Sequence, residues 1–95
     1  MTYRLTQEAE NDLVHVFREG VRQFGFHQAE TYYHALIDRF EFLAANPRAA
    51  RERVELAPPV RVHPYKSHLI LYHIEEPDVV IVGVRHSRED WASSY

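Results

Sequence analysis

HLILYHIEEPDVVIVGVRH, residues 68–86, contains two strand-like runs separated by a short connection that is rich in turn-forming residues. We predict strands over His68–Glu76 and Val79–His86. Successive side chains of a strand point to opposite faces of a sheet, and both faces of both runs are apolar here. One face takes Ile70, Tyr72, Ile74, Val79 and Ile81, and the other takes Leu69, Leu71, Val80, Val82 and Val84.

The pairing of these two strands sets which side chains meet across the hairpin. If Ile74 pairs with Val79, an antiparallel register places His68 opposite Arg85. Both residues would then share a face with Ile70. A slip of one residue would reverse every such assignment.

The residues before this hairpin predict a short strand and two helices. Thr2–Leu5 alternates as a strand, and Thr6 suits the N-cap of the helix that follows. Gly25 ends that helix, and Asn46-Pro47 ends the second helix, which begins near His27. Each helix has an apolar stripe at three-and-four spacing. The stripes are Ala9, Leu13, Val16, Phe17, Val21 and Phe24, and then Ala29, Tyr32, Tyr33, Leu36, Ile37, Phe40 and Leu43.

A long irregular stretch, Pro47–Pro59, leads to a third predicted strand at Val60–His63, and a polar tail over Ser87–Tyr95 closes the chain. The predicted order is β-α-α-β-β-β, which indicates one α+β domain over residues 1–95. A helix hairpin would pack on a mainly antiparallel sheet. Two helices can cover one sheet face, so the second apolar face suggests a partner protein.

Composition excludes several classes of protein. The chain has no cysteine and therefore no disulfide framework, and no apolar run approaches the length of a membrane span. We expect a soluble, cytoplasmic protein without a membrane partner. The formal net charge is -3, which argues against a general nucleic-acid binder and gives no reason to expect sequence-specific nucleic-acid binding. Residues 48–66 alone carry five Lys or Arg against two Asp or Glu, a basic segment that could dock on an acidic partner or be a solvated loop.

The seven histidines do not predict a metal site, because none of their spacings matches that of ligands to one ion. The apolar stripes are explained by helix packing, so no cofactor is expected. Trp91 in the polar tail has two readings that the sequence leaves open. It is either an exposed anchor for a partner or a residue that folds back onto the helices.

Several short motifs together resemble the RelE/ParE superfamily of bacterial type II toxins, and the ParE branch in particular. The second predicted helix ends FEFLAANP, residues 40–47, similar to the family's F-x-x-L-A-x-N-P. The last strand continues into VRHSRED, residues 84–90, similar to V-x-H-x-R-x-D. The opening YRLT with Ala9 and Asp12-Leu13, the segment Arg61–Pro64 and the run from His68 to Ile74 also follow the family's order and spacing.

The resemblance implies a RelE/ParE-like fold and a bacterial toxin held inactive by a cognate ParD-like antitoxin. The ParE branch acts on DNA gyrase, whereas RelE proteins are ribosome-dependent mRNA endoribonucleases. Leu69 stands where the resemblance to the ribonucleases implies an arginine, so we expect a gyrase-binding protein rather than an enzyme. The ribonuclease alternative would use catalytic residues drawn from Arg61, Lys66, His68, Arg85 and His86.

Two binding surfaces are predicted alongside this alternative. The antitoxin surface is the sheet face that the helices leave uncovered, with Arg61, Tyr65 and Leu71 at its groove. The surface for the target is the end of the last strand, with Arg85, His86, Arg88 and Trp91. His86 has a competing interpretation, in which its side chain makes a hydrogen bond that fixes the turn into the tail and has no part in binding or catalysis.

Overall fold

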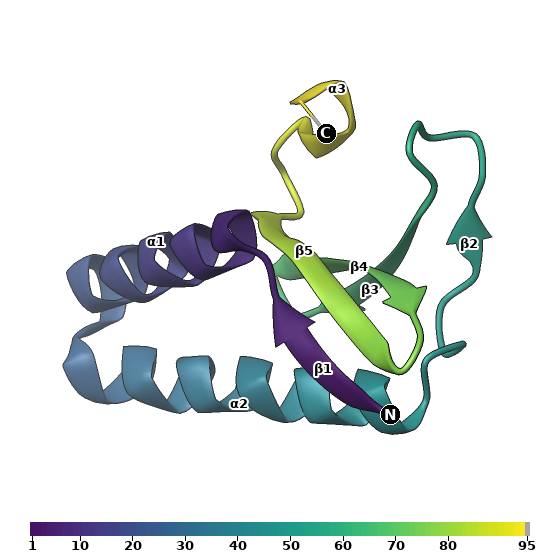
Figure 1. The fold of residues 1–95 in the computed structure, drawn as a ribbon. Coiled ribbons are helices and arrows are strands. Elements are labelled where there is room, and N and C mark those ends of the chain that lie inside the picture. The colour runs from purple at the N-terminus through teal and green to yellow at the C-terminus, as the bar shows by residue number, and fades with distance from the viewer. Residues whose placement is uncertain (95) are drawn as a thin grey trace.

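A computed structural model describes residues 1–94 and contains a helix hairpin beside a twisted sheet (Figure 1). Strand β1 (Thr2–Leu5) is followed by helices α1 (Gln7–Phe24) and α2 (Phe26–Ala45). Four strands then come in succession and a short helix ends the described chain. They are β2 (Glu52–Arg53), β3 (Val60–Tyr65), β4 (His68–Glu75), β5 (Asp78–His86) and α3 (Trp91–Ser94). None of the helices in residues 1–94 is long and apolar enough to span a membrane.

The sheet has the strand order β1-β5-β4-β3-β2, with β1 parallel to β5 and every other pair antiparallel. This confirms the α+β class and the helix hairpin on a mainly antiparallel sheet. The two-residue β2 and the four-residue α3 were not predicted, because elements that short show no measurable apolar period.

Local chemistry sets the ends of the hairpin helices as the sequence predicts. The hydroxyl of Thr6 accepts a hydrogen bond of 3.1 Å from the backbone N–H of Ala9 and so caps α1. Gly25 has φ +88°, a left-handed conformation in which a side chain would be strained, and it alone separates α1 from α2. So short a connection makes the two helices antiparallel neighbours.

The main core lies between the hairpin and one sheet face. Its fully buried members come from α1, α2, β4 and β5, and Tyr3 and Leu5 of β1 pack against it. They are Ala9, Leu13, Leu36, Phe40, Leu43, Ile70, Tyr72, Val79, Ile81 and Val84. The predicted division of β4 is confirmed, since Ile70 and Tyr72 face the helices while Leu69 and Leu71 belong to the cluster on the other face.

A β-bulge in β5 overturns the predicted register beyond Ile81. Ile74 pairs with Val79 as expected, but Tyr72 pairs with Ile81 and Leu71 with Gly83, so Val82 is an extra residue. The bulge places His68 opposite His86 rather than opposite Arg85. It also turns Val84 to the helix side, with Ile81, where simple alternation placed it on the far face.

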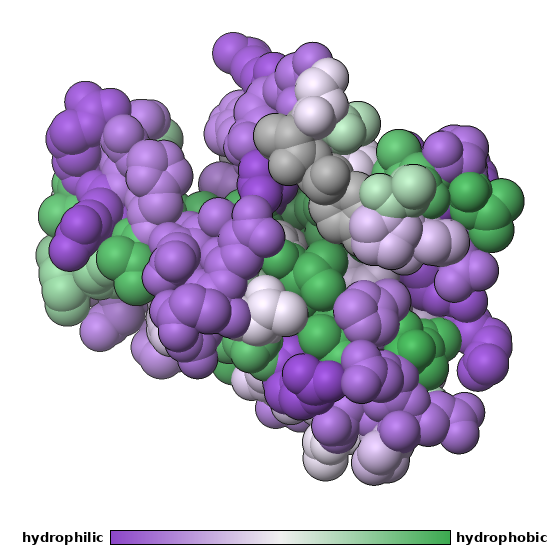
Figure 2. Space-filling view, turned by 45° about the horizontal axis from the view of Figure 1, so that its top comes forward, coloured by the Kyte–Doolittle hydropathy of each residue, from purple (hydrophilic) through white to green (hydrophobic). Residues whose placement is uncertain are grey.

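The far face of the sheet is partly covered by this chain itself, which corrects the expectation that only a partner could cover it. Trp91 of α3 is 9% exposed and packs with Val60, Val62 and Leu71, and Leu56 of the long loop adds to the same cluster. Trp91 therefore folds back onto the sheet, not onto the helices. Figure 2 shows green, apolar surface in the middle of this view.

Candidate functional site

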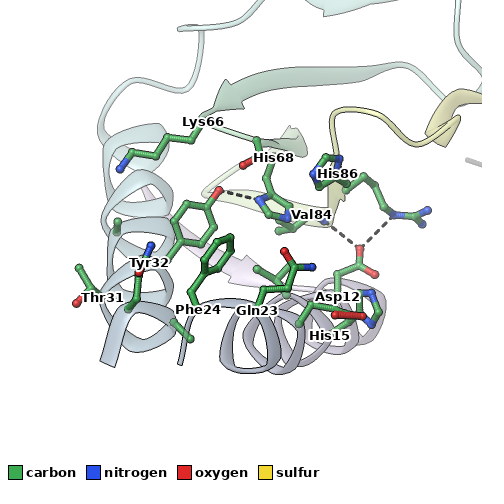
Figure 3. Close-up of a pocket in the computed structure, with 18 of the residues that line it drawn as sticks. Asp12, His15, Gln23, Phe24, Thr31, Tyr32, Lys66, His68, Val84 and His86 are labelled. Atoms are coloured by element: carbon green, nitrogen blue, oxygen red, sulfur yellow. Dashed lines mark hydrogen bonds and ion pairs between the residues drawn. The ribbon is translucent and has the colours of Figure 1, made fainter. Parts of the chain in front are cut away.

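A cavity of about 640 Å³ lies between the helix hairpin and the ends of β4 and β5. It forms because α1 and α2 extend past the end of the sheet, so that the inner side of the hairpin is left without a strand to cover it (Figure 1). Figure 3 shows its polar side chains converging from α1, α2 and the sheet. Its walls include Asp12, His15, Glu19, Gln23, Gln28, Tyr32, Lys66, His68, Arg85, His86 and Glu89.

Arg85 lies at one side of the cavity and is surrounded by three carboxylates. Its Nη2 is 2.6 Å from Oε1 of Glu8, its Nε is 3.2 Å from Oδ2 of Asp12, and its Nη1 is 3.3 Å from Oε2 of Glu89. Only 16% of the Arg85 side chain is exposed. Glu8 and Asp12 are one helical turn apart on α1, so one guanidinium can reach both.

Asp12 also fixes the backbone of β5. Its Oδ2 accepts a 2.9 Å hydrogen bond from the N–H of Val84, just after the bulge (Figure 3). Burial raises the pKa of this carboxyl, although the Val84 N–H and Arg85 both act to lower it. Burial alone would lower the pKa of Arg85, but the neighbouring Asp12, Glu89 and Glu8 raise it. Arg85 is therefore a fully charged group whose charge is already neutralised by the protein.

Tyr32 of α2 and the two histidines at the strand ends form another part of the cavity wall. The hydroxyl of Tyr32 lies 2.7 Å from Nδ1 of His68, and the ring of His68 meets the ring of His86 edge-on at 5.3 Å (Figure 3). Burial lowers the pKa of His68, with a further contribution from the neighbouring His86 and His15, and Glu89 opposes the shift. His68 is therefore neutral near pH 7.

The cavity brings together four of the five residues of the predicted catalytic set. Lys66, His68, Arg85 and His86 all line it. Arg61 lies elsewhere, where its Nη1 donates a 2.6 Å hydrogen bond to the carbonyl of Ala50. His68 and Arg85 do not face one another as the predicted register required, because the bulge pairs Arg85 with Leu69.

The predicted antitoxin set does not form one surface. Arg61 and Tyr65 pair across the sheet with Tyr72 and His68, and Tyr65 packs against the helix-side core. Leu71 belongs to the far-face cluster and is 2% exposed. The structure therefore splits this set between the two faces of the sheet.

The predicted target set lies along the end of β5 and the turn that follows. His86 and Arg88 are exposed, whereas Arg85 is held by carboxylates and Trp91 is buried on the far face. Nδ1 of His86 accepts a 3.1 Å hydrogen bond from the backbone N–H of Arg88. This is the structural hydrogen bond in the turn that was the competing interpretation for His86.

Sequence reasoning missed Tyr32, Asp12, Glu8 and Glu89 as parts of this site. Tyr32 was counted only as a member of an apolar helix stripe, and Asp12 only as part of the opening motif of the family. One signal was available, because Arg85 and Glu89 are four residues apart in the motif that follows the last strand. Within residues 1–94, no three or more His, Asp or Glu side chains are placed to hold one metal ion.

Comparisons with known proteins match almost the whole chain. Residues 3–91 fit the family model described as the ParE toxin of type II toxin–antitoxin systems, parDE. Toxin ParE3 from Caulobacter vibrioides is 31% identical over 88 residues, which cover 93% of this chain and 88% of that protein. The chain belongs to the ParE toxin family. It is thus a ParE-type toxin of a type II toxin–antitoxin system, as the sequence motifs indicated.

A solved structure supports the fold of this ParE-family chain independently. The structure titled as the chromosomal ParDE TA system from P. aeruginosa superposes with a TM-score of 0.78 at 16% identity. The match covers 90% of this chain and 95% of the other. At this identity the similarity shows a shared architecture and leaves function to be argued from the site.

Proposed function

We propose that this ParE-type toxin inhibits DNA gyrase by binding it in the bacterial cytoplasm and is neutralised by a ParD-like antitoxin. Family membership supports this target, because the ParE branch is the gyrase-directed branch of the superfamily. The ParDE context of the structural relative supports a ParD-type partner.

One observation favours binding over RNA cleavage. An endoribonuclease of this superfamily needs free cationic groups to hold the scissile phosphate and to stabilise charge in the transition state. Arg85 is the arginine of the cavity, and Glu8, Asp12 and Glu89 already neutralise it at distances of 2.6–3.3 Å. A phosphate would have to displace these carboxylates, which would then repel it.

A supercoiling assay with purified gyrase, relaxed DNA and ATP tests the proposal. We expect the chain to block supercoiling or to trap cleaved DNA, and a co-purified ParD-like antitoxin to restore activity. Arg88→Ala should weaken inhibition, because Arg88 is an exposed cation in the predicted target set. Arg18→Ala, at another exposed arginine, on α1, is the matched control. Normal supercoiling at a large molar excess of folded protein would reject the proposal.

The endoribonuclease alternative keeps one observation in its favour. His68 and His86 are adjacent imidazoles in one cavity, and neutral His68 could act as a general base toward a 2′-hydroxyl. This alternative predicts mRNA cleavage in a translating extract and its loss in His86→Ala. Intact mRNA in the presence of protein that is active against gyrase would exclude it.

A further inference from the structure

The C-terminal half of α2 carries a second group of basic and aromatic side chains, outside the cavity described above (Figure 1). Arg39 is partly buried there, and its guanidinium carbon lies 4.2 Å from the ring centroid of Phe42. Nη2 of Arg39 is 3.1 Å from Nε2 of His63 on β3. Burial and Arg39 lower the pKa of His63, so its ring is neutral near pH 7 and accepts this hydrogen bond. Two rings therefore hold the arginine in place.

Arg39 differs from Arg85 because no carboxylate neutralises its charge. Within residues 1–94 no Asp or Glu oxygen lies within 4 Å of the Arg39 guanidinium, whereas Arg85 has three such partners. Nε of Arg39 is also buried without a hydrogen-bond partner in this part of the chain. A partly buried cation without a counter-ion costs free energy, and this cost falls when an anion binds beside it.

A shallow groove of about 400 Å³ lies on the C-terminal side of Phe42. It is lined by Phe42, Asn46, Pro47, Arg48 and Ala49. The ring of Phe42 is 37% exposed, and Arg48 is exposed and forms no ion pair within residues 1–94. Arg39 approaches Phe42 from one turn earlier in α2. Phe42 therefore lies between two arginines whose charges the described chain leaves without a counter-ion.

The negative end of the helix dipole is attenuated here, because the last carbonyls of α2 are already bonded. The N–H of Asn46 donates to the carbonyls of Phe42 and Leu43, at 2.9 and 3.2 Å. Nδ2 of Asn46 donates to the carbonyl of Phe42 as well, at 3.0 Å. Capped carbonyls of this kind repel a neighbouring anion less than free ones do. The cations of Arg39 and Arg48 therefore dominate the local field.

The chemistry of this surface selects a nucleic acid strand over an acidic protein. Residues 48–66 carry five Lys or Arg against two Asp or Glu, and one of the acids, Glu55, is 3.7 Å from Arg51. Guanidinium groups bind phosphate oxygens in planar, two-point contacts. An exposed aromatic ring beside such cations is typical of surfaces on which an unpaired base stacks. A carboxylate side chain offers no aromatic face to Phe42, so this ring distinguishes the two partners.

We propose that Arg39, Phe42 and Arg48 bind single-stranded DNA without sequence preference, with one base against Phe42 and phosphates on the two arginines. Contacts to phosphates and to the face of a base carry no sequence information. The choice of DNA rests on the proposed gyrase target, whereas binding of a single strand does not. In a gyrase inhibitor this surface would contact a strand that the enzyme has opened.

Fluorescence anisotropy with a short labelled oligothymidine tests the surface without gyrase or antitoxin. The slope of log K against log salt should be about −1.4, as expected for two phosphate contacts on a single strand. A duplex of the same length should bind at least about fivefold more weakly, because its stacked bases are not available to Phe42. No binding at about 50 mM salt, or equal or tighter binding of the duplex, would overturn the proposal.

Variants separate the phosphate contacts from the stacking contact. Arg48→Ala should weaken binding about fivefold at low salt and reduce the slope by about 0.7, because one phosphate contact is lost. Phe42→Leu keeps an apolar side chain beside Arg39 but removes the aromatic face, so binding should weaken about fivefold with an unchanged slope. Arg22→Ala is the matched control, since Arg22 on α1 is exposed and already paired with Glu19 at 2.8 Å. Wild-type binding by Arg48→Ala or by Phe42→Leu would overturn the assignment.

Two competitors test the class of partner. An oligoglutamate of matched charge should displace the oligothymidine only at a higher concentration, because it cannot stack on Phe42. Equal or tighter binding of the oligoglutamate would overturn the proposal in favour of an acidic protein. Tighter binding of oligouridine than of oligothymidine would overturn the choice of DNA. All of these readouts are independent of the supercoiling assay, so their failure would leave the proposed inhibition of gyrase unaffected.

Discussion

Asp12 of α1 and Arg85 of β5 are 73 positions apart in sequence, yet Oδ2 of Asp12 lies 3.2 Å from Nε of Arg85. The same oxygen accepts a hydrogen bond from the N–H of Val84. One carboxylate therefore fixes the end of β5 to the first helix and neutralises the arginine of the cavity. It also explains why the cavity does not present Arg85 as a free cation.

We expect Asp12→Ala to lower the free energy of unfolding by roughly 2–3 kcal/mol, because a partly buried arginine and a backbone N–H both lose their acceptor. Asp12→Asn should cost less, since its amide oxygen can still accept from Val84. Urea denaturation measures both values. Glu10→Gln on the exposed side of α1 is the control. Equal stability of Asp12→Ala and the wild type would show that this contact contributes nothing to folding.

Gly83 provides the space that Asp12 occupies. A Cβ at this position would lie 3.2 Å from Oδ2 of Asp12 and 3.5 Å from Nε of Arg85. Gly83→Ala should therefore lower stability by about 1–2 kcal/mol. In an Asp12→Ala background the same substitution should cost less, because the crowded oxygen is gone. Thermal melts of the four proteins give the coupling, and strictly additive effects would contradict the steric explanation.

Tyr72 ties the long loop to the sheet from inside the core. Its hydroxyl donates to the carbonyl of Pro47 at 2.9 Å and accepts from the N–H of Ala50 at 3.3 Å, and its side chain is fully buried. Tyr72→Phe should cost about 1–2 kcal/mol, because both backbone groups lose a partner. Urea denaturation measures this loss, and hydrogen exchange at Ala50 should accelerate. Tyr33→Phe, a partly buried tyrosine of the hairpin, is the comparison.

Substitutions of Trp91 distinguish a residue of the core from an exposed anchor for a partner. Because it packs on Val60, Val62 and Leu71, Trp91→Ala should cost roughly 2–3 kcal/mol in an unfolding experiment. Trp91→Phe should recover part of that loss. An exposed anchor would behave differently, since its truncation would leave stability unchanged and weaken only the effect on gyrase. That result would reject the packing seen here.

The lowered pKa of His68 predicts a loss of stability in mild acid. Burial disfavours the protonated ring in the folded state, with contributions from His86 and His15 that Glu89 opposes. The unfolded chain binds the proton near the ordinary pKa of about 6.5, so this part of the stability is complete above that pH and falls as the pH decreases through it. The loss stops once the pH is below the pKa of the folded state.

His68→Gln removes this titration. Unfolding free energies at about pH 7.5 and pH 5.5 should differ less for the variant than for the wild type. His63→Gln gives a second test, because burial and Arg39 also lower the pKa of His63. An unchanged difference between the two pH values in both variants would contradict the assigned shifts.

Much of the fold could be predicted from local patterns. The apolar stripes, the cap at Thr6, the stop at Gly25 and the alternation along β4 each depend on neighbours within a few residues. Motifs of a few residues each likewise indicated the ParE family. Local patterns did not reach the contacts that join distant parts of the chain. The placement of the antitoxin set on two faces of the sheet and the choice between the two readings of Trp91 both depend on such contacts.

The sequence by itself determined the helix hairpin, the strand hairpin and the family, because hydrophobic periodicity and capping are local properties of the chain. Only the tertiary structure decided what the candidate site is. The bulge at Val82 paired His68 with His86 and turned Val84 inward, and Asp12 reached across from α1 to neutralise Arg85. The physical reason is that one extra residue in a strand changes the facing of every residue beyond it. An ion pair such as Asp12–Arg85 forms because the two side chains are close in space, and a local stretch of sequence does not show which distant residues become neighbours.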